Sequence, residues 1–106
     1  MFLAKKTYYT DYAIHAWRYF LSNPDVEKVM KITTKPCIIA NWNACKRVYD
    51  GLNEIEREFI QTAYLEKDTI PDNVFALSKR TGSDQNVIWR VLRDCEAKFA
   101  RERGLI

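Results

Sequence analysis

The apolar residues of this chain recur at helical spacing in short stretches, and a proline, an asparagine or a glycine interrupts each stretch. Apolar residues three and four positions apart lie on one face of an α-helix. The interruptions fall at Asn23-Pro24, Pro36, Gly51, Pro71 and Gly82, and these residue types begin or end helices. We therefore expect an all-α fold, a compact bundle of about five to six helices.

The expected helices span residues 10–22, 24–31, 37–50, 53–65, 71–82 and 83–103, each to within a residue or two. Asn23 is expected to cap the second helix, because an asparagine side chain accepts hydrogen bonds from free helical amides. Gly51 suits a left-handed cap after the third helix. Asn53 and Glu56 have the spacing of a capping box at the start of the fourth. Ser83 is expected to cap the last helix.

A chain of 106 residues, 47% of them hydrophobic, can build one hydrophobic core but not two. We expect a single domain spanning residues 1–106, in which residues 1–50 supply N-terminal helices and residues 52–106 form a helix-turn-helix unit. The fourth and sixth helices carry apolar stripes that should face the core. Their members are Ile55, Phe59, Ala63, Ile88, Leu92, Cys95 and Phe99.

The three cysteines, Cys37, Cys45 and Cys95, lie within apolar helical patterns, which predicts buried, reduced thiols. With His15 as the single histidine, their spacing fits no zinc motif, so we expect no metal and no cofactor. The sequence holds no arrangement of a catalytic nucleophile and no glycine-rich phosphate loop, and we expect a protein that is not an enzyme. No stretch has the length of a signal peptide or a membrane span, which predicts a cytoplasmic protein without a membrane partner.

The last third of the chain carries its clearest functional signal. A short apolar helix with Val74 and Leu77 leads into Thr81-Gly82-Ser83, and a long amphipathic helix follows. Two helices joined by a tight turn are typical of a helix-turn-helix, whose second helix enters the major groove of DNA. The same arrangement is also a general packing unit, and in that case the outer face of the second helix is merely solvated.

Polar and cationic side chains open this second helix. Gln85 and Asn86 carry amides that can hydrogen-bond adenine, and Arg90 carries a guanidinium that can pair with guanine. Trp89 either packs against a thymine methyl or a sugar or belongs to the core. The groups expected to hold phosphates are Lys79, Arg80, Arg93 and the free amides of the turn that Ser83 caps.

Charge is distributed unevenly along the chain. Residues 79–103 hold seven basic and four acidic side chains, whereas residues 53–72 hold two basic and six acidic ones. The net charge of the whole chain is only +3. DNA binding would therefore depend on where the charges lie and not on their total.

A resemblance to known families covers about the last half of the chain. Residues 52–60 (LNEIEREFI), followed by Tyr64-Leu65, resemble the opening helix of domain four in housekeeping sigma factors. Residues 98–106 (KFARERGLI) are similar to the ends of phage transcriptional regulators of the ArpU and RinA type. The chain departs from the sigma spacing by a few extra residues after Leu65. The resemblance implies a transcriptional regulator of phage or mobile-element origin, with RNA polymerase as a second partner.

The sequence thus predicts sequence-specific binding of double-stranded DNA, with a homodimer as one way to gain affinity, because a single small module buries little DNA surface. The alternative is a protein-interaction module, such as an anti-repressor, an adaptor or a packaging accessory. Its contact surface would be the acidic helix from Asn53 together with the aromatic N-terminal quarter. The aromatic and basic residues of that quarter could also stack on single-stranded bases or form a dimer surface. They include Lys5, Lys6, Tyr8, Tyr9, Tyr12, Trp17, Tyr19 and Phe20.

Overall fold

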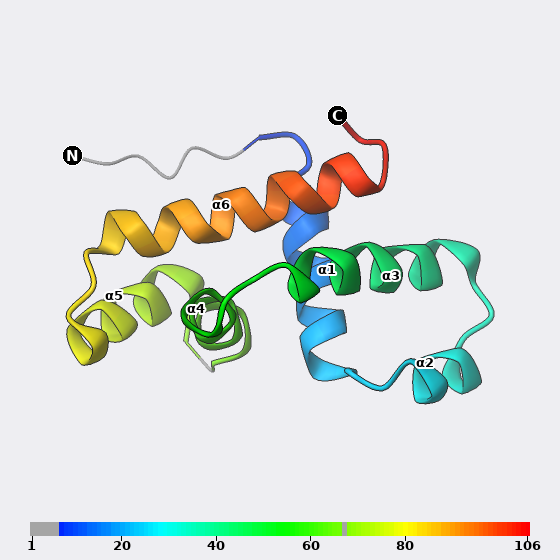
Figure 1. The fold of residues 1–106 in the computed structure, drawn as a ribbon, viewed down its shortest axis with the longest axis horizontal. Coiled ribbons are helices and arrows are strands. Elements are labelled where there is room, and N and C mark those ends of the chain that lie inside the picture. Colours follow the sequence, from blue (N-terminus) through cyan, green and yellow to red (C-terminus); the bar gives the residue numbers. More distant parts are fainter. Residues whose placement is uncertain (1–6, 67) are drawn as a thin grey trace.

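The computed structural model describes residues 7–66 and 68–106, and these residues form six α-helices (Figure 1). The helices are α1 (Thr10–Ser22), α2 (Val26–Ile32), α3 (Pro36–Asp50), α4 (Glu54–Leu65), α5 (Ile70–Thr81) and α6 (Gln85–Glu102). Neither described stretch contains a strand. The predicted all-α fold is confirmed, and the expected helix boundaries agree with the observed ones to within about two residues.

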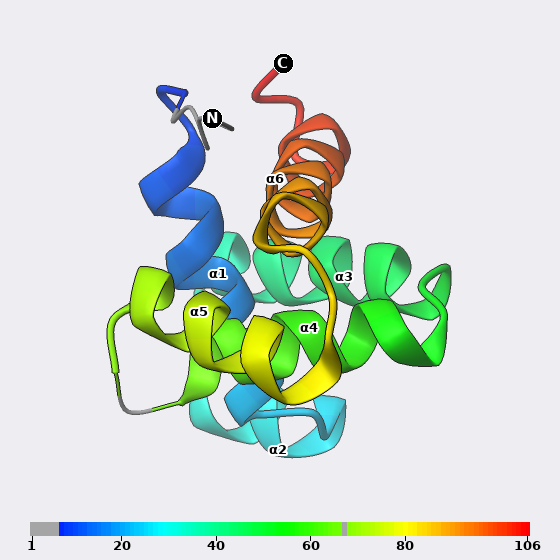
Figure 2. The same ribbon diagram turned by 90° about the vertical axis from the view of Figure 1, so that its left-hand side faces the viewer.

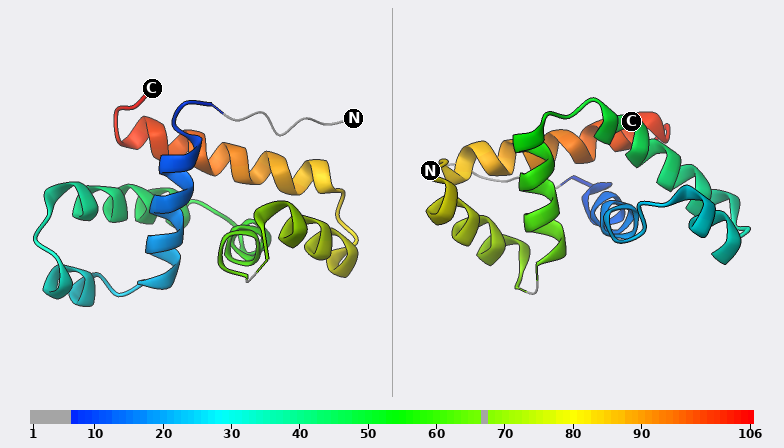
Figure 3. Two further views of the ribbon diagram at one scale, coloured as in Figure 1. Left: turned by 180° about the vertical axis from the view of Figure 1, so that it is seen from behind. Right: turned by 60° about the horizontal axis from the view of Figure 1, so that its bottom comes forward.

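The long helix α6 runs along one side of the molecule, and α1 crosses beneath it at a steep angle (Figure 1). Helix α1 packs against α3, α4 and α6, and the C-terminal helices α4, α5 and α6 pack against one another in pairs. Figure 2 looks nearly along α6 and shows α1 beside it, with α4 and α5 below. Helix α2 lies on the opposite side of the molecule from α6, below α3 (Figure 3, left).

One hydrophobic cluster takes buried side chains from all six helices. Trp17 of α1 and Phe99 of α6 are its largest fully buried members. The Trp17 Nε1 atom donates a hydrogen bond to the Cys95 carbonyl oxygen at 3.3 Å, so the polar edge of the indole is satisfied inside the core. The two sequence halves therefore share one core.

Two connections follow the expected local chemistry. Asn53 and Glu56 form the predicted capping box at the start of α4. Gly82 ends α5 in a left-handed conformation with φ of 76°. The connection between α4 and α5 is closed by the buried Asn73, whose Nδ2 atom lies 3.0 Å from the Ala63 carbonyl oxygen and 3.1 Å from that of Asp68.

Other local predictions were wrong. Asn23 ends α1, and its side-chain amide donates to the Tyr19 carbonyl oxygen. The Asp25 carboxylate caps α2 in place of Asn23. Gly51 has φ of −88°, because the chain leaves α3 through a right-handed turn. Cys37 is exposed, whereas Cys45 and Cys95 are buried as expected.

Ile55 was expected in the buried stripe of α4 and is 63% exposed, whereas Phe59, Ile60 and Ala63 of that helix are buried. The buried face of α4 is turned toward Ile60 and Tyr64, because α4 contacts α1, α5 and α6 together. The expectations for Lys5 and Lys6 lie outside the described residues. None of the helices within the described ranges combines the length and the apolar character needed to span a bilayer.

Candidate nucleic-acid interface

Helices α5 and α6 are joined by only three residues, 82–84. The Gly82 amide donates to the Ser78 carbonyl oxygen at 2.9 Å, which closes the end of α5. The Ser78 hydroxyl donates to the Ser83 carbonyl oxygen at 2.5 Å and ties the turn to α5. These two bonds fix where α6 starts relative to α5.

Helix α6 has a fully buried inner face and an open outer face. Ile88, Leu92, Cys95 and Phe99 are all 0% exposed, as their helical spacing predicts. The side chains that share the opposite, exposed face are Val87, Arg90, Asp94, Lys98 and Arg101. Lys98 and Asp94 form an ion pair at 2.9 Å, and the hydrogen bond to Asp94 raises the pKa of Lys98. Arg90 and Arg101 therefore supply the net positive charge of this face.

The first two turns of α6 bring polar side chains together in solvent. Gln85, Asn86 and Arg90 are exposed, and Val87 beside them is 46% exposed. Two amides, one guanidinium and one apolar group on an open helical face are suited to hydrogen bonds with base edges and to contact with a thymine methyl.

The prediction that Ser83 caps α6 was wrong. The Asp84 side chain is the cap and accepts from the Asn86 backbone amide at 2.7 Å. Asp84 has the extended backbone geometry of an N-cap, with φ of −65° and ψ of 139°, and Ser83 lies one position too early. The capping carboxylate uses one of the free amides at this helix end and places a negative charge there, so this end is less suited to a phosphate than the sequence suggested.

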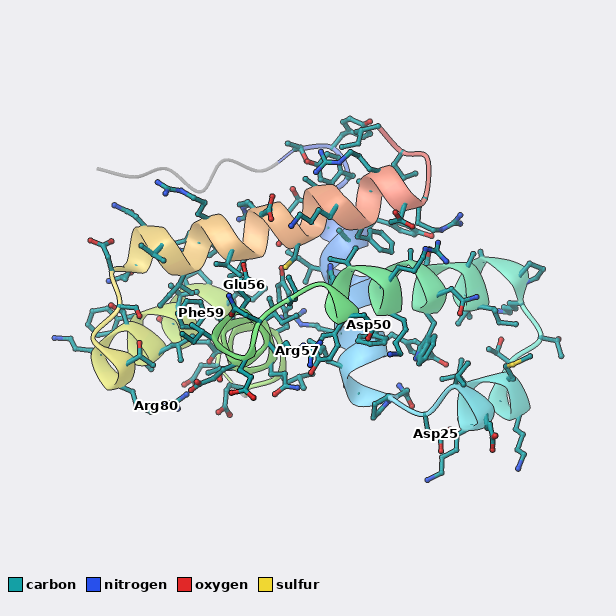
Figure 4. All side chains as sticks on the ribbon, viewed as in Figure 1. Asp25, Asp50, Glu56, Arg57, Phe59 and Arg80 are labelled. Carbon is teal, nitrogen blue, oxygen red and sulfur yellow. The ribbon has the colours of Figure 1, made fainter. Side chains whose placement is uncertain are left out.

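The two cations at the end of α5 have different surroundings. The Arg80 guanidinium lies 3.4 Å from the Glu58 carboxylate of α4 and 3.4 Å from the Thr62 hydroxyl. Figure 4 shows Arg80 on the side of α5 away from α6. Lys79 is exposed, with its Nζ atom 5.2 Å from the centre of the Phe75 ring. Lys79 is thus available to a phosphate, whereas Arg80 already has a carboxylate partner.

Trp89 and Arg93 lie on the flank of α6 that faces α1. Trp89 is half-buried and packs against the core. The Arg93 side chain is 19% exposed, and its Nη1 atom lies 2.7 and 3.0 Å from the two carboxylate oxygens of Glu96. Its guanidinium lies 5.0 Å from the centre of the Trp89 ring. The structure places both residues at the edge of the outer face.

Glu96 is the buried centre of this flank, at 1% exposure. It accepts a hydrogen bond from the Tyr64 hydroxyl at 2.5 Å. Burial, together with the nearby negative charge of Glu96, raises the pKa of Tyr64 well above its usual value, so the hydroxyl stays protonated and acts as the donor.

Sequence reasoning missed Asp84, Glu96 and Tyr64. The three-residue spacing of Arg93 and Glu96 was a signal for an ion pair along the helix, but that spacing cannot show that the pair is buried. The Asp84 cap was visible as an alternative, since aspartate and serine are equally good N-caps.

Residues 7–66 and 68–106 contain no cluster of histidine, cysteine, aspartate and glutamate that could hold a metal ion. No protein-family pattern, no curated protein and no solved structure matches this chain.

Proposed function

We propose that this protein binds double-stranded DNA in a sequence-specific manner, with α5 and α6 acting as a helix-turn-helix and the first two turns of α6 lying in the major groove. The observation that supports this is the joint exposure of Gln85, Asn86 and Arg90. They lie at the start of a helix whose opposite face is buried and which follows a three-residue turn.

The side chains divide into two groups. Gln85, Asn86 and Arg90 contact bases, because amides pair with adenine and guanidinium with guanine. Lys79 contacts a phosphate from the end of α5. Arg80 does the same once DNA replaces Glu58 as its partner. Trp89 and Arg93 border the duplex from the flank of α6.

We further propose that the protein is a transcriptional regulator of phage or mobile-element origin that acts with RNA polymerase. This rests on the likeness of residues 52–60 and 98–106 to sigma-factor domain four and to the phage regulators. A single module of this size gives limited affinity, and a homodimer or the polymerase supplies the remaining contacts.

Selection of bound duplexes from a random pool tests the proposal, followed by binding titrations at several salt concentrations. We expect enrichment of one short sequence and an affinity that falls as salt rises. Arg90→Ala should weaken binding to the selected sequence by about 1–3 kcal/mol and relax the preference at one base pair. Lys79→Ala should weaken all sequences alike and reduce the salt slope by about one unit.

Arg101→Ala is the matched control, because Arg101 lies on the same exposed face roughly 16 Å further along α6. It should leave the sequence preference unchanged. Failure to enrich any sequence, or equal effects of the Arg90 and Arg101 substitutions, would rule the proposal out.

A second candidate function is a protein-interaction module, and the apolar surface of α2 favours it. Met30 is 58% exposed and Ile32 is 70% exposed, although α2 has only seven residues. Two exposed apolar side chains so close together can form part of a contact surface when a partner covers them. The same selection separates the two functions, since an interaction module enriches no DNA sequence.

A further inference from the structure

A pocket of about 300 Å³ lies between the middle of α1, the start of α5 and the second and third turns of α6. Figure 2 shows α1 and α6 side by side, with α5 below them. Ile14, Ile70, Pro71 and Trp89 give the pocket its apolar walls. Pockets of this size with mostly apolar walls and a few polar groups are typical of small-molecule sites.

Two guanidinium groups reach this pocket, from Arg18 and Arg93. The charge of Arg93 is balanced by its contact with Glu96. Arg18 forms no ion pair within residues 7–66 or 68–106, and its Nε atom donates to the Tyr64 carbonyl oxygen at 3.0 Å. The pocket therefore carries one uncompensated positive charge, which suits a ligand with a single negative charge.

One network contacts both guanidiniums; its centre, Tyr64 and Glu96, is buried, whereas Arg18 at its edge is exposed. Tyr64 accepts from Arg18 through its carbonyl oxygen and donates to Glu96 through its hydroxyl at 2.5 Å, and Glu96 accepts from Arg93 at 2.7 Å. A buried ion pair rarely adds stability over well-packed apolar side chains. What the network does provide is a hydrogen-bond partner for each of the two cationic groups beside the pocket, and such preorganisation lowers the cost of binding a ligand.

The walls define the rest of the ligand. The Trp89 indole is half-buried beside the buried Ile14 and the half-buried Ile70, and a flat apolar ring system can pack against these surfaces. We propose that the pocket is a binding site for a small planar organic monoanion, such as an aromatic carboxylate. The carboxylate pairs with Arg18 and the ring system packs on Trp89. This site does not depend on the proposed DNA binding, although it adjoins the proposed DNA face.

The indole N–H signals of the ¹⁵N-labelled full chain provide the test, with 2-naphthoate as the probe and neutral 2-naphthamide as its uncharged counterpart. The Trp17 and Trp42 indoles are buried and donate to the Cys95 and Asn23 carbonyl oxygens. The third signal belongs to Trp89, and Trp89→Phe assigns it. We expect 2-naphthoate to shift this signal saturably and 2-naphthamide to bind at least about tenfold more weakly.

Arg18→Gln should weaken 2-naphthoate at least about tenfold, because it removes the unpaired guanidinium. Arg101→Gln, which removes an exposed arginine outside the pocket, should leave the affinity unchanged. Circular dichroism checks that both variants are folded.

The proposal is overturned if 2-naphthoate and 2-naphthamide bind with equal affinity, or if Arg18→Gln does not weaken the binding of 2-naphthoate. The absence of a saturable shift at Trp89 also overturns it. If 2-naphthoate gives no such shift while Arg18→Gln flattens the salt dependence of DNA binding, the pocket is a site for a DNA phosphate and not for a small molecule.

Discussion

Glu96 shows how one residue can couple distant parts of this chain. Its carboxylate, 1% exposed, contacts Arg93 one turn earlier on α6 and the Tyr64 hydroxyl of α4. A buried carboxylate needs such partners, because removing a charge from water costs several kcal/mol. The residue thus holds α4 and the flank of α6 in a fixed relation.

Removal of the cation of this pair should be costly. Arg93→Ala leaves the Glu96 carboxylate buried with one partner fewer, and we expect a loss of about 3–5 kcal/mol in the free energy of unfolding, measured by urea denaturation. Lys98→Ala is the control, since it removes the cation of an exposed ion pair on the same helix and should cost less than about 0.5 kcal/mol. Similar losses in the two variants would contradict the assigned role of Glu96.

The three cysteine thiols should differ in reactivity according to their burial. Burial raises the pKa of Cys95 to about 12. The pKa of Cys45 is raised even further, mainly by burial and to a smaller extent by electrostatic repulsion from Cys95. At pH 8 we expect a disulfide reagent to modify one thiol quickly, that of the exposed Cys37, and the other two only in denaturant. Cys37→Ser should abolish the fast phase, and a fast phase that persists would show that a buried thiol is accessible.

The raised thiol pKa values also predict a pH dependence of stability. The folded state favours the protonated thiols, so their contribution to stability is complete below the unfolded pKa of about 8.5. As the pH rises from there toward the folded pKa of Cys95, about 12, the free energy of unfolding should fall. Urea denaturation at a series of alkaline pH values measures this, and a stability that rises over the same interval would contradict the burial of these thiols.

At the scale of the helices, the turn between α5 and α6 depends on a glycine. Gly82 has φ of 76°, and an added Cβ would meet no atom within 4 Å, so any cost of Gly82→Ala comes from the backbone alone. We expect a loss of about 1–2 kcal/mol in thermal or urea denaturation. Gly51→Ala is the matched comparison: Gly51 has φ of −88° and an added Cβ would make an ordinary 3.5 Å contact, which predicts no loss. Equal losses would mean that Gly82 is not held in the left-handed conformation.

The elements show which features a sequence can predict. The starts and ends of the helices were largely predictable, because caps such as the Asn53–Glu56 box act within a few residues. The inner face of α6 was also predictable from its 3.6-residue spacing. Which flank of a helix is buried depends on its neighbours, so the exposure of Ile55 and the half-burial of Trp89 could not be inferred. The pairing of Arg80 with Glu58 also joins two helices, and no local pattern shows it.

At the scale of the whole molecule, the N-terminal helices are part of the core. Helix α1 packs against α3, α4 and α6, and Trp17, at 0% exposure, bonds to the backbone of α6. The helices that carry the proposed DNA face are thus held in place by residues 1–50, which contribute none of the proposed DNA contacts.

A fragment of residues 52–106 should therefore not fold on its own. Without α1, the apolar flank of α6 that covers Trp17 would face water, and burial of a large side chain contributes about 1.5–3 kcal/mol. We expect the fragment to show a weak helical signal without a cooperative thermal transition, whereas the full chain unfolds cooperatively. Trp17→Ala in the full chain tests the same contact without truncation and should cost about 3–5 kcal/mol. A cooperative transition in the fragment, with dispersed amide signals in its NMR spectrum, would show that α4, α5 and α6 fold as an autonomous unit without α1.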